Sequence, residues 1–348
     1  MITPATLDGY VFDEDMYSNQ PGIHELLREM NEKVLSKYDI VCIGETLNVN
    51  PETARLYSDE VRKEIDMVCN SELMFIDAGP KWKWDVIPWK LTDFKRIIEK
   101  WQVGLFGKGW SCLYFSNHDQ PRMVSRFGND TIYRKESAKL LATLLLTIHG
   151  TPFIYQGEEI GMTNVRFSSI EDYRDVETLN FFKEAVNSGW PVEKVMEAIY
   201  CKGRDNVRTP MQLNDEKNAG FTKGEPWIKV NPNYKEINVA QSSTDPDSVL
   251  NYYKKLIQIR KNLPVLIYGE FNLILEDDEQ IFAYTRKLGN DKVLVILNFS
   301  NEYAWFNSPE SVDQNNIELL ISNYETERTE QLNCLKLRPY EARVYKYD

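Results

Sequence analysis

The sequence predicts an α/β domain with a parallel sheet, followed by a smaller all-β domain. Three observations support this fold class. Short apolar strands alternate with helical segments as far as residue 155, which is typical of βα units and a parallel sheet. Polar residues gather where these strands end, as they do at the catalytic end of a (β/α)8 barrel. After Pro264 the pattern changes to short β-type runs separated by turn residues, so we divide the chain into residues 1–263 and 264–348.

The α/β part is predicted to begin with a helix at residues 24–37, where five apolar side chains fall on one helical face. Residues 40–44 (IVCIG) follow, and they are apolar and rich in β-branched residues. This composition predicts a strand that is buried on both faces of a parallel sheet. The same alternation continues along the chain. Further strands are predicted at residues 73–76, 112–115 and 153–155, and further helices at 51–57, 92–101 and 134–148.

Residues 162–245 depart from this alternation. They hold a helical stretch at 171–186 and then a stretch rich in glycine, proline and asparagine at 202–233. An excursion of this length inside a domain is usually functional. Ser248 is expected to cap a helix that runs to residue 261. In the C-terminal part, strands are predicted at 265–275, 281–287, 292–299, 317–323 and 335–347.

The composition limits the classes of function. A net charge of −12 over 348 residues disfavours nucleic acid and anionic membranes as partners. The five cysteines are widely spaced, without a CxxC pair or a Cys/His cluster, so we expect no zinc site, no disulfide framework and a reducing compartment. The N-terminal residues lack the pattern of a signal peptide, and no run approaches the ~20 apolar residues of a membrane span. These observations predict a cytoplasmic protein with a neutral substrate.

Two acidic residues follow predicted strands. Glu45 ends VCIGE and Asp119 ends LYFSNHD, and alternate strands of a barrel would bring them to opposite sides of one pocket. Cleavage of a glycosidic bond needs a carboxylic acid to protonate the leaving oxygen and a carboxylate that faces the anomeric carbon. A glutamate among apolar neighbours has a raised pKa, so Glu45 suits the acid/base role and Asp119, beside His118, a charge-stabilising role. From spacing alone, a helix cap or a turn is the commoner role of such residues.

Several longer motifs give a stronger indication of function. YDIVCIGE, LYFSNHDQPRMVSRFGND, GTPFIYQGEEIGMTNVRF and RDNVRTPMQL together resemble the α-glucosidase branch of glycoside hydrolase family 13. This branch contains oligo-1,6-glucosidases, dextran glucosidases, maltases and trehalose-6-phosphate hydrolases. The resemblance extends from about residue 20 to the C-terminus. It implies an α/β fold consisting of the second half of a (β/α)8 TIM barrel, strands 5–8, followed by a C-terminal all-β sandwich.

The resemblance also implies roles for individual residues. Glu45 matches the general acid/base after the fifth barrel strand, and Asp119 matches the carboxylate after the seventh strand that stabilises the transition state. His118 matches its hydroxyl-binding neighbour. Arg204 matches the arginine that binds the non-reducing-end glucose, with Arg208 as the near alternative. The implied activity is retaining exo-hydrolysis of α-1,6- or α-1,4-linked gluco-oligosaccharides such as isomaltose or maltose, without a cofactor.

One family motif is missing. The family's nucleophilic aspartate lies in a motif like FRMDVIN, and residues 1–4 resemble the residues that follow it. We therefore expect the nucleophile, the first four strands and the family's calcium-binding loop to lie upstream, and no metal site in this chain. The chain alone would be inactive and would need the missing half of the barrel as a partner. A non-catalytic descendant that binds sugar or another protein is the alternative, although it need not have kept Glu45, His118, Asp119 and Arg204.

Other motif residues are assigned structural roles. Gln156, Glu158 and Glu159 follow the last predicted strand of the barrel part and should hold nearby loops in place. Arg122 and Arg126 follow the Asn-His-Asp turn and are expected to pair with acidic side chains.

Overall fold

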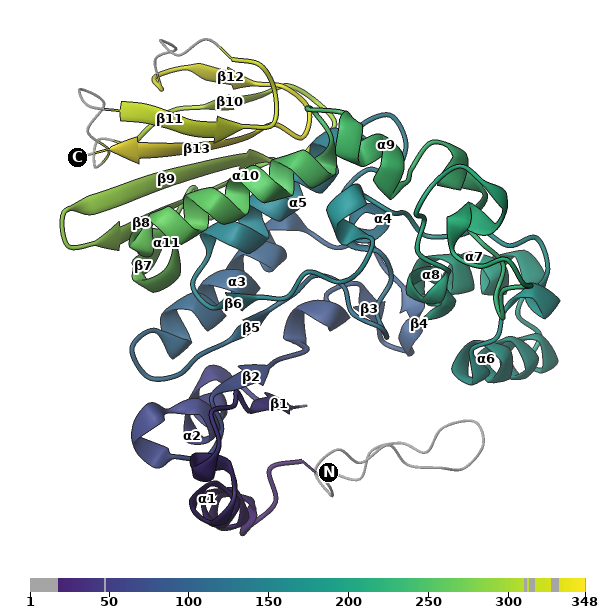
Figure 1. The fold of residues 1–348 in the computed structure, drawn as a ribbon, viewed down its shortest axis with the longest axis horizontal. Coiled ribbons are helices and arrows are strands. Elements are labelled where there is room, and N and C mark those ends of the chain that lie inside the picture. The colour runs from purple at the N-terminus through teal and green to yellow at the C-terminus, as the bar shows by residue number, and fades with distance from the viewer. Residues whose placement is uncertain (1–17, 47, 310–311, 313–316, 327–331, 348) are drawn as a thin grey trace.

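The computed structural model describes residues 18–46, 48–309, 312, 317–326 and 332–347. An α/β part comes first along the chain, and an antiparallel β-sheet from the C-terminal residues packs over one side of it (Figure 1). None of the helices in these ranges is long and apolar enough to cross a membrane.

Four short parallel strands form the centre of the α/β part. β1 pairs with β2 and β5 pairs with β6, and a parallel bridge between Val68 and Ser111 joins the two pairs. The strand order is therefore β1-β2-β5-β6, and the carboxyl ends of all four strands lie at one edge. The strands are β1 (Ile43–Glu45), β2 (Met67–Cys69), β5 (Cys112–Leu113) and β6 (Thr151–Pro152).

Helices connect these strands, because neighbouring parallel strands need crossover connections. The helix of residues 134–147 agrees closely with the prediction of 134–148, and Ser248 caps the helix that it was expected to cap by accepting a hydrogen bond from the Asn251 amide. The α-helices are α1 (Ile23–Lys33), α2 (Pro51–Ser58), α3 (Leu91–Leu105), α4 (Met123–Phe127), α5 (Arg134–Thr147), α6 (Val176–Asn187), α7 (Val192–Lys202), α8 (Asp205–Arg208), α9 (Val239–Thr244), α10 (Val249–Asn262) and α11 (Pro264–Tyr268). The 3-10 helices are η2 (Leu35–Lys37), η3 (Glu60–Arg62), η4 (Glu72–Phe75), η5 (Glu158–Ile160), η6 (Ile170–Asp172), η7 (Lys217–Gly220) and η8 (Pro232–Lys235).

The strand that carries Glu45 is more exposed than the sequence predicts. Ile40, Val41 and Ile43 are 51%, 64% and 44% exposed, although such an apolar run predicts a strand buried on both faces. β1 pairs with β2 along one edge and has no strand partner along its other edge within the described ranges. The prediction of burial on both faces is therefore wrong for the described residues, among which β1 lies at the outer edge of the parallel strands.

Three other element predictions are also wrong in position or type. Residues 73–76 form most of η4 instead of a strand, and the strand lies earlier, at β2. The strand predicted at 153–155 lies two residues earlier, at β6. The run 265–275 is divided between α11 and a following strand, because Pro264 occupies the first helical turn, where its fixed φ favours a helix. Short apolar runs do not by themselves distinguish a strand from a helix.

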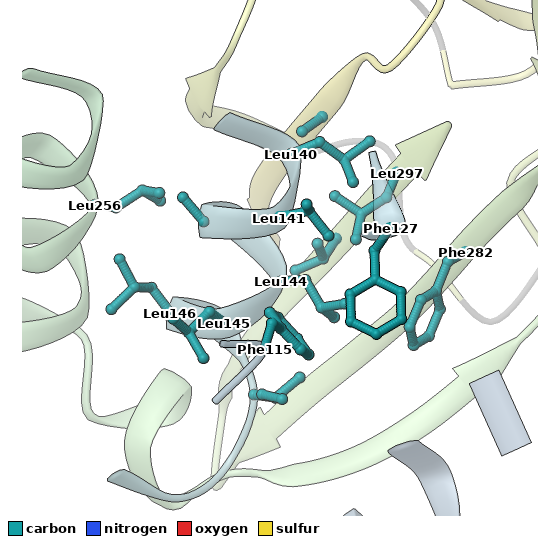
Figure 2. Packing of buried hydrophobic residues seen from close by; sticks show 14 of the residues in the cluster. Phe115, Phe127, Leu140, Leu141, Leu144, Leu145, Leu146, Leu256, Phe282 and Leu297 are labelled. Carbon is teal, nitrogen blue, oxygen red and sulfur yellow. The ribbon is translucent and has the colours of Figure 1, made fainter. Parts of the chain in front are cut away.

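The main hydrophobic core surrounds α5. Residues 137–147 of this helix are all buried, and most of its second half is apolar, as expected for a helix surrounded by core. Figure 2 shows the leucines of α5 between Leu256 of α10 on one side and Phe282 and Leu297 of the C-terminal sheet on the other. The core therefore contains residues from both sides of position 264.

The C-terminal residues form a five-stranded antiparallel sheet in the order β11-β13-β9-β8-β7 and a separate pair, β10-β12. Side chains alternate between the faces of a strand. On β8, Phe282 and Tyr284 join the main core, whereas Ile281 and Ala283 join a second core shared with β10 and β12. The strands are β7 (Glu270–Ile274), β8 (Ile281–Leu288), β9 (Asp291–Asn298), β10 (Ala304–Phe306), β11 (Ile317–Ser322), β12 (Leu335–Leu337) and β13 (Ala342–Tyr347).

Buried cations connect this sheet to the α/β part. Arg286 on β8 donates hydrogen bonds to the carbonyl oxygens of Thr147 and Gly269. Lys95 on α3 donates to the carbonyl oxygen of Leu275, at 2.5 Å. Both cations are fully buried, so the carbonyl oxygens replace water as their hydrogen-bond acceptors.

The long excursion between β6 and α10 carries α6 to α9 and lies at the right of Figure 1. It has its own small core, in which Trp84 stacks on Phe181 with the ring centroids 4.4 Å apart. Trp84 belongs to a hairpin that follows η4, so this hairpin and the excursion pack together. The hairpin consists of β3 (Ala78–Gly79) and β4 (Trp82–Val86).

Candidate active site

Glu45 is the last residue of β1 and lines a cavity of about 310 Å³ at the carboxyl edge of the parallel strands. We call this the Glu45 cavity. Glu45 is exposed, so the apolar enclosure expected for a protonated glutamate is incomplete among the described residues. The cavity is lined by Ile43, Glu45, Cys69, Tyr114, Ser116, Asn117, His118, Phe153, Ile154 and Tyr155.

The turn after β5 carries Asp119. The side-chain oxygen of Asn117 accepts a hydrogen bond from the Asp119 amide at 2.8 Å, which fixes the turn. His118 Nε2 lies 3.3 Å from Asp119 Oδ2. His118 also lines the Glu45 cavity, whereas Asp119 is not among the described residues that line it. The structure thus brings Glu45 and Asp119 to the same edge of the sheet. His118 connects them, because it lines the cavity that holds Glu45 and contacts Asp119.

Both candidate arginines reach Asp119. Arg208 Nη2 donates a hydrogen bond to Asp119 Oδ1 at 2.7 Å, and Arg208 Nε donates to the His118 carbonyl oxygen at 3.0 Å. Arg204 Nε lies 3.4 Å from Asp119 Oδ1 and 3.0 Å from Glu177 Oε2. That nitrogen is buried without an aligned hydrogen bond to a described residue. Arg208 therefore makes the stronger contact with Asp119, and Arg204 lies between two carboxylates.

Three residues of this site were not found by sequence reasoning. Asp175 caps the N-terminus of α6, and its Oδ1 lies 3.4 Å from Arg208 Nη1. Glu177, in the first turn of α6, also forms a 2.7 Å ion pair with Lys83 of β4. The sequence gives one signal for Asp175, because aspartate is a favoured N-cap residue. It gives none for the contacts with arginine, which join segments that are far apart in the chain.

The charges of this cluster are mostly compensated. Asp119, Asp175 and Glu177 face Arg204, Arg208 and Lys83. Burial lowers the pKa of Lys83, and its ion pair with Glu177 opposes that shift. An arrangement of fixed cations around two partly exposed carboxylates, Asp119 and Glu177, is suited to binding a neutral ligand that has many hydroxyl groups, because each hydroxyl can donate and accept.

A buried ion cluster packs next to the turn after β5, because Arg126 of this cluster also donates a hydrogen bond to Gln120 in that turn. Asp77 Oδ2 accepts a hydrogen bond from Arg126 Nε at 2.9 Å, and Asp77 Oδ1 accepts one from Lys202 Nζ at 2.6 Å. The expectation that Arg126 pairs with an acid is confirmed. Arg122 instead donates hydrogen bonds to backbone carbonyl oxygens, including that of Gln156 at 2.5 Å. The expectation that Arg122 pairs with an acid is therefore wrong, because carbonyl oxygens surround its buried guanidinium.

Glu158 has the structural role that the sequence suggests. It is buried, and it accepts hydrogen bonds from the Tyr253 hydroxyl at 3.1 Å and the Tyr155 amide at 3.2 Å. Burial raises the pKa of Glu158 to about 8.

The pH dependence of stability provides a test of this buried acid. A neutral Glu158 stabilises the fold fully below its unfolded pKa, near 4.5, and this contribution is lost as the pH rises through about 8. We expect the free energy of unfolding, measured with urea at a series of pH values, to fall over that interval. In Glu158→Gln, which stays neutral, the fall should be smaller. Equal pH profiles for the two proteins would contradict the assignment.

The structure bears on the N-terminal residues and on the expected absence of a metal site as follows. Residues 1–4, compared above with the segment after the family's nucleophile motif, lie outside the described residues. Within the described ranges, no group of three or more histidine, cysteine, aspartate or glutamate side chains is arranged to hold a metal ion.

Comparisons with known proteins agree with the resemblance. A family model described as "Alpha amylase, catalytic domain" matches residues 4–269, and one described as "Alpha-amylase SusG C-terminal domain" matches residues 281–344. The oligo-1,6-glucosidase of Parageobacillus thermoglucosidasius is 57% identical over 344 residues, which are 99% of this chain and 61% of that protein. The oligo-1,6-glucosidase of Bacillus cereus is 56% identical over 340 residues, which are 97% of this chain and 61% of that protein.

Solved structures give the same result. The crystal structure of Bacillus licheniformis trehalose-6-phosphate hydrolase matches with a TM-score of 0.92 and 42% identity, covering 96% of this chain and 60% of that one. The chain thus spans about 60% of the length of the relatives that it matches. The catalytic-domain model covers most of the 348 residues. The chain therefore belongs to the alpha-amylase family, glycoside hydrolase family 13, whose fold is a TIM barrel with a C-terminal β domain.

Proposed function

We propose that this chain carries the acid/base half of a retaining exo-α-glucosidase active site that acts on short α-1,6- or α-1,4-linked gluco-oligosaccharides. In this proposal Glu45 protonates the leaving oxygen, and Asp119 stabilises the transition state. His118 and Arg204, together with Arg208, bind the hydroxyl groups of the non-reducing-end glucose. Because two relatives are named oligo-1,6-glucosidases, we take isomaltose-like oligosaccharides as the first choice of substrate for this chain.

One observation carries this proposal. Glu45 and His118 line the same cavity, and Asp119 contacts His118 and Arg208 directly beside it. A carboxyl group in the wall of a sugar-sized cavity can protonate the leaving oxygen, and a carboxylate held by cations beside that cavity can stabilise the positive charge of the transition state. A cavity of about 310 Å³ falls at the lower end of the size range of small-molecule sites.

The nucleophile is the part of the site that these residues do not provide. A retaining glycosidase needs a carboxylate roughly 5 Å from its acid/base. Asp119 is held by Arg208 and assigned to the transition state, so it is not free to act as the nucleophile. We propose that a polypeptide segment outside these 348 residues supplies the nucleophile, together with the remaining strands of the barrel, and that the chain alone is inactive. In this division, residues 1–263 are the second half of the barrel, with strands 5–8, and residues 264–348 are the C-terminal β-sandwich.

That segment would pack along the edge of β1 that has no strand partner among the described residues. Val41 and Ile43 are 64% and 44% exposed there, and Phe153, across the Glu45 cavity, is 37% exposed. Exposed apolar groups beside an unpaired strand edge are usually covered by a neighbouring strand or chain.

Five free cysteines are compatible with the reducing cytoplasm, which is where we place the protein.

A complementation experiment tests the proposed function. The chain is co-expressed with the segment of the Parageobacillus thermoglucosidasius relative that it does not match, and both polypeptides are also expressed alone. We expect the two polypeptides together to hydrolyse p-nitrophenyl α-glucoside and isomaltose, with retention of the anomeric configuration seen by NMR. Each polypeptide alone should show no hydrolysis above background, because each lacks one of the two essential carboxylates.

Two outcomes would contradict the proposal. Hydrolysis by the chain alone would show that it contains its own nucleophile. A soluble, purified complex without hydrolysis would mean that the site is not catalytic, and isothermal titration with isomaltose and maltose would then show whether it still binds sugar.

A further inference from the structure

Two cysteines lie opposite each other on neighbouring strands beside the Glu45 cavity. An isolated parallel bridge joins Val68 and Ser111, so the next residue on each strand, Cys69 on β2 and Cys112 on β5, lies opposite the other in the same register. Paired residues of a parallel sheet share a face, and neighbouring strands are about 4.8 Å apart. Disulfides join residues whose Cα atoms are about 4.4–6.8 Å apart. The register therefore places the Cα atoms of the two cysteines at a spacing that a disulfide can span.

The pair is accessible from one side. Cys69 is directly paired with Glu45 on β1, and Cys112 with Thr151 on β6, so the four residues form a row across the sheet. Cys69 is partly exposed and lines the Glu45 cavity, whereas Cys112 is 2% exposed. A small reagent that enters the Glu45 cavity thus meets Cys69, whereas Cys112 is not among the described residues that line it.

The two thiols differ in reactivity. The interaction between the two thiols lowers the pKa of Cys69, although burial and the Glu45 charge oppose it. The same interaction, together with burial, raises the pKa of Cys112. Thiolates, not thiols, react with oxidants. Cys69 is also the more exposed of the two thiols and lines the cavity, so we assign the attack to Cys69 and the second step to Cys112.

We propose that Cys69 and Cys112 form a peroxide-reactive dithiol site that closes to a disulfide in the wall of the Glu45 cavity. The Cys69 thiolate attacks one oxygen of hydrogen peroxide, the O–O bond breaks, and Cys69 sulfenic acid and one water form once the leaving hydroxide takes a proton. Cys112 then attacks the Cys69 sulfur, the S–O bond breaks, and the Cys112 proton leaves with the hydroxide as a second water. Two thiols and one peroxide thus give one disulfide and two waters.

This site is independent of the proposed hydrolytic function, because it needs neither a nucleophilic aspartate nor a sugar. It can be tested on the chain alone. The reduced, purified chain is treated with hydrogen peroxide, and its thiols are then counted with Ellman's reagent in urea. We expect the count to fall from five to three, and the mass to fall by two hydrogen atoms. A tryptic digest without reductant should contain residues 64–81 joined to residues 109–122.

Matched variants separate this pair from the other cysteines. Cys334→Ser, which removes an exposed thiol, should leave the linked peptides unchanged. Cys69→Ser and Cys112→Ser should both abolish the link, and Cys112→Ser should leave a sulfenic acid at Cys69 that dimedone labels. Survival of all five thiols, or linkage of residues 64–81 to any other cysteine peptide, would overturn the proposal. So would equal formation of this link in the urea-unfolded chain, because the folded register would then not be its cause.

Discussion

Replacing Glu45 by glutamine in the complemented enzyme is expected to reduce kcat for isomaltose by about 10³-fold. A positioned general acid contributes about 10²–10⁴-fold to the rate. Glutamine keeps the size of the side chain at the end of β1 but cannot transfer a proton. The loss should be smaller for p-nitrophenyl α-glucoside, because nitrophenolate leaves without protonation. Measurement of kcat for both substrates, with the variant and the unchanged protein, tests the acid role separately from the binding role.

A matched control lies on the next helix. Glu52, in the first turn of α2, is exposed and outside the Glu45 cavity, so Glu52→Gln should leave both kcat values unchanged. Equal losses on the two substrates with Glu45→Gln would indicate a role in binding or folding instead of proton transfer. Restored activity that is insensitive to Glu45→Gln would overturn the site assignment, although the family membership would remain.

Removing the Asp77 carboxylate is expected to cause the largest loss of stability, about 3–5 kcal/mol of unfolding free energy. The side chains of Asp77, Arg126 and Lys202 are 7%, 2% and 2% exposed, so Asp77→Ala leaves two buried cations without their shared partner. Burial alone would raise the pKa of Asp77, but Arg126 and Lys202 outweigh it and hold that pKa below its ordinary value. Urea denaturation of the two proteins measures the difference.

The pH dependence gives a second readout of the same cluster. Because the pKa of Asp77 is lowered, its contribution is present above the ordinary aspartate pKa of 3.8 and is lost as the pH falls through the folded-state value. The difference in stability between Asp77→Ala and the unchanged protein should therefore shrink in acid. Asp277, whose side chain is 89% exposed in its ion pair with Arg96, provides the control, and Asp277→Ala should have no measurable effect. A similar effect at Asp77 and Asp277 would contradict the role assigned to the cluster.

The sequence predicts the long, strongly patterned elements well. The apolar run of α5, the capped start of α10 and the strands β8 and β9 lie within two residues of their predicted bounds. The short elements are less certain, because three or four apolar residues satisfy a strand and a helical turn equally, as residues 73–76 show. The local composition of β1 does not predict its exposure, because burial depends on neighbours that the local sequence does not specify; the expectation of a half barrel does imply an exposed strand edge.

In the candidate site, too, the local sequence predicts some features, whereas others depend on contacts between distant parts of the chain. The motifs place Glu45, His118 and Asp119 at strand ends, and the structure brings them to one edge of the sheet. They do not distinguish Arg204 from Arg208, because both arginines lie on the same short segment. Only the fold shows that Arg208 donates the aligned hydrogen bond to Asp119. Contacts of this kind join distant parts of the chain, so no local pattern records them.

The junction between α5 and the C-terminal sheet has an evolutionary consequence. Phe282 and Leu297 belong to the same core as the leucines of α5, and Arg286 on the same sheet donates a hydrogen bond to the carbonyl oxygen of Thr147 at the end of that helix. A recombination event that exchanged only the C-terminal segment between homologues would bring together side chains that had not been selected to fit. Substitutions on the two sides of this junction should therefore be inherited in matched pairs, and chimeric genes that cross it should be counter-selected.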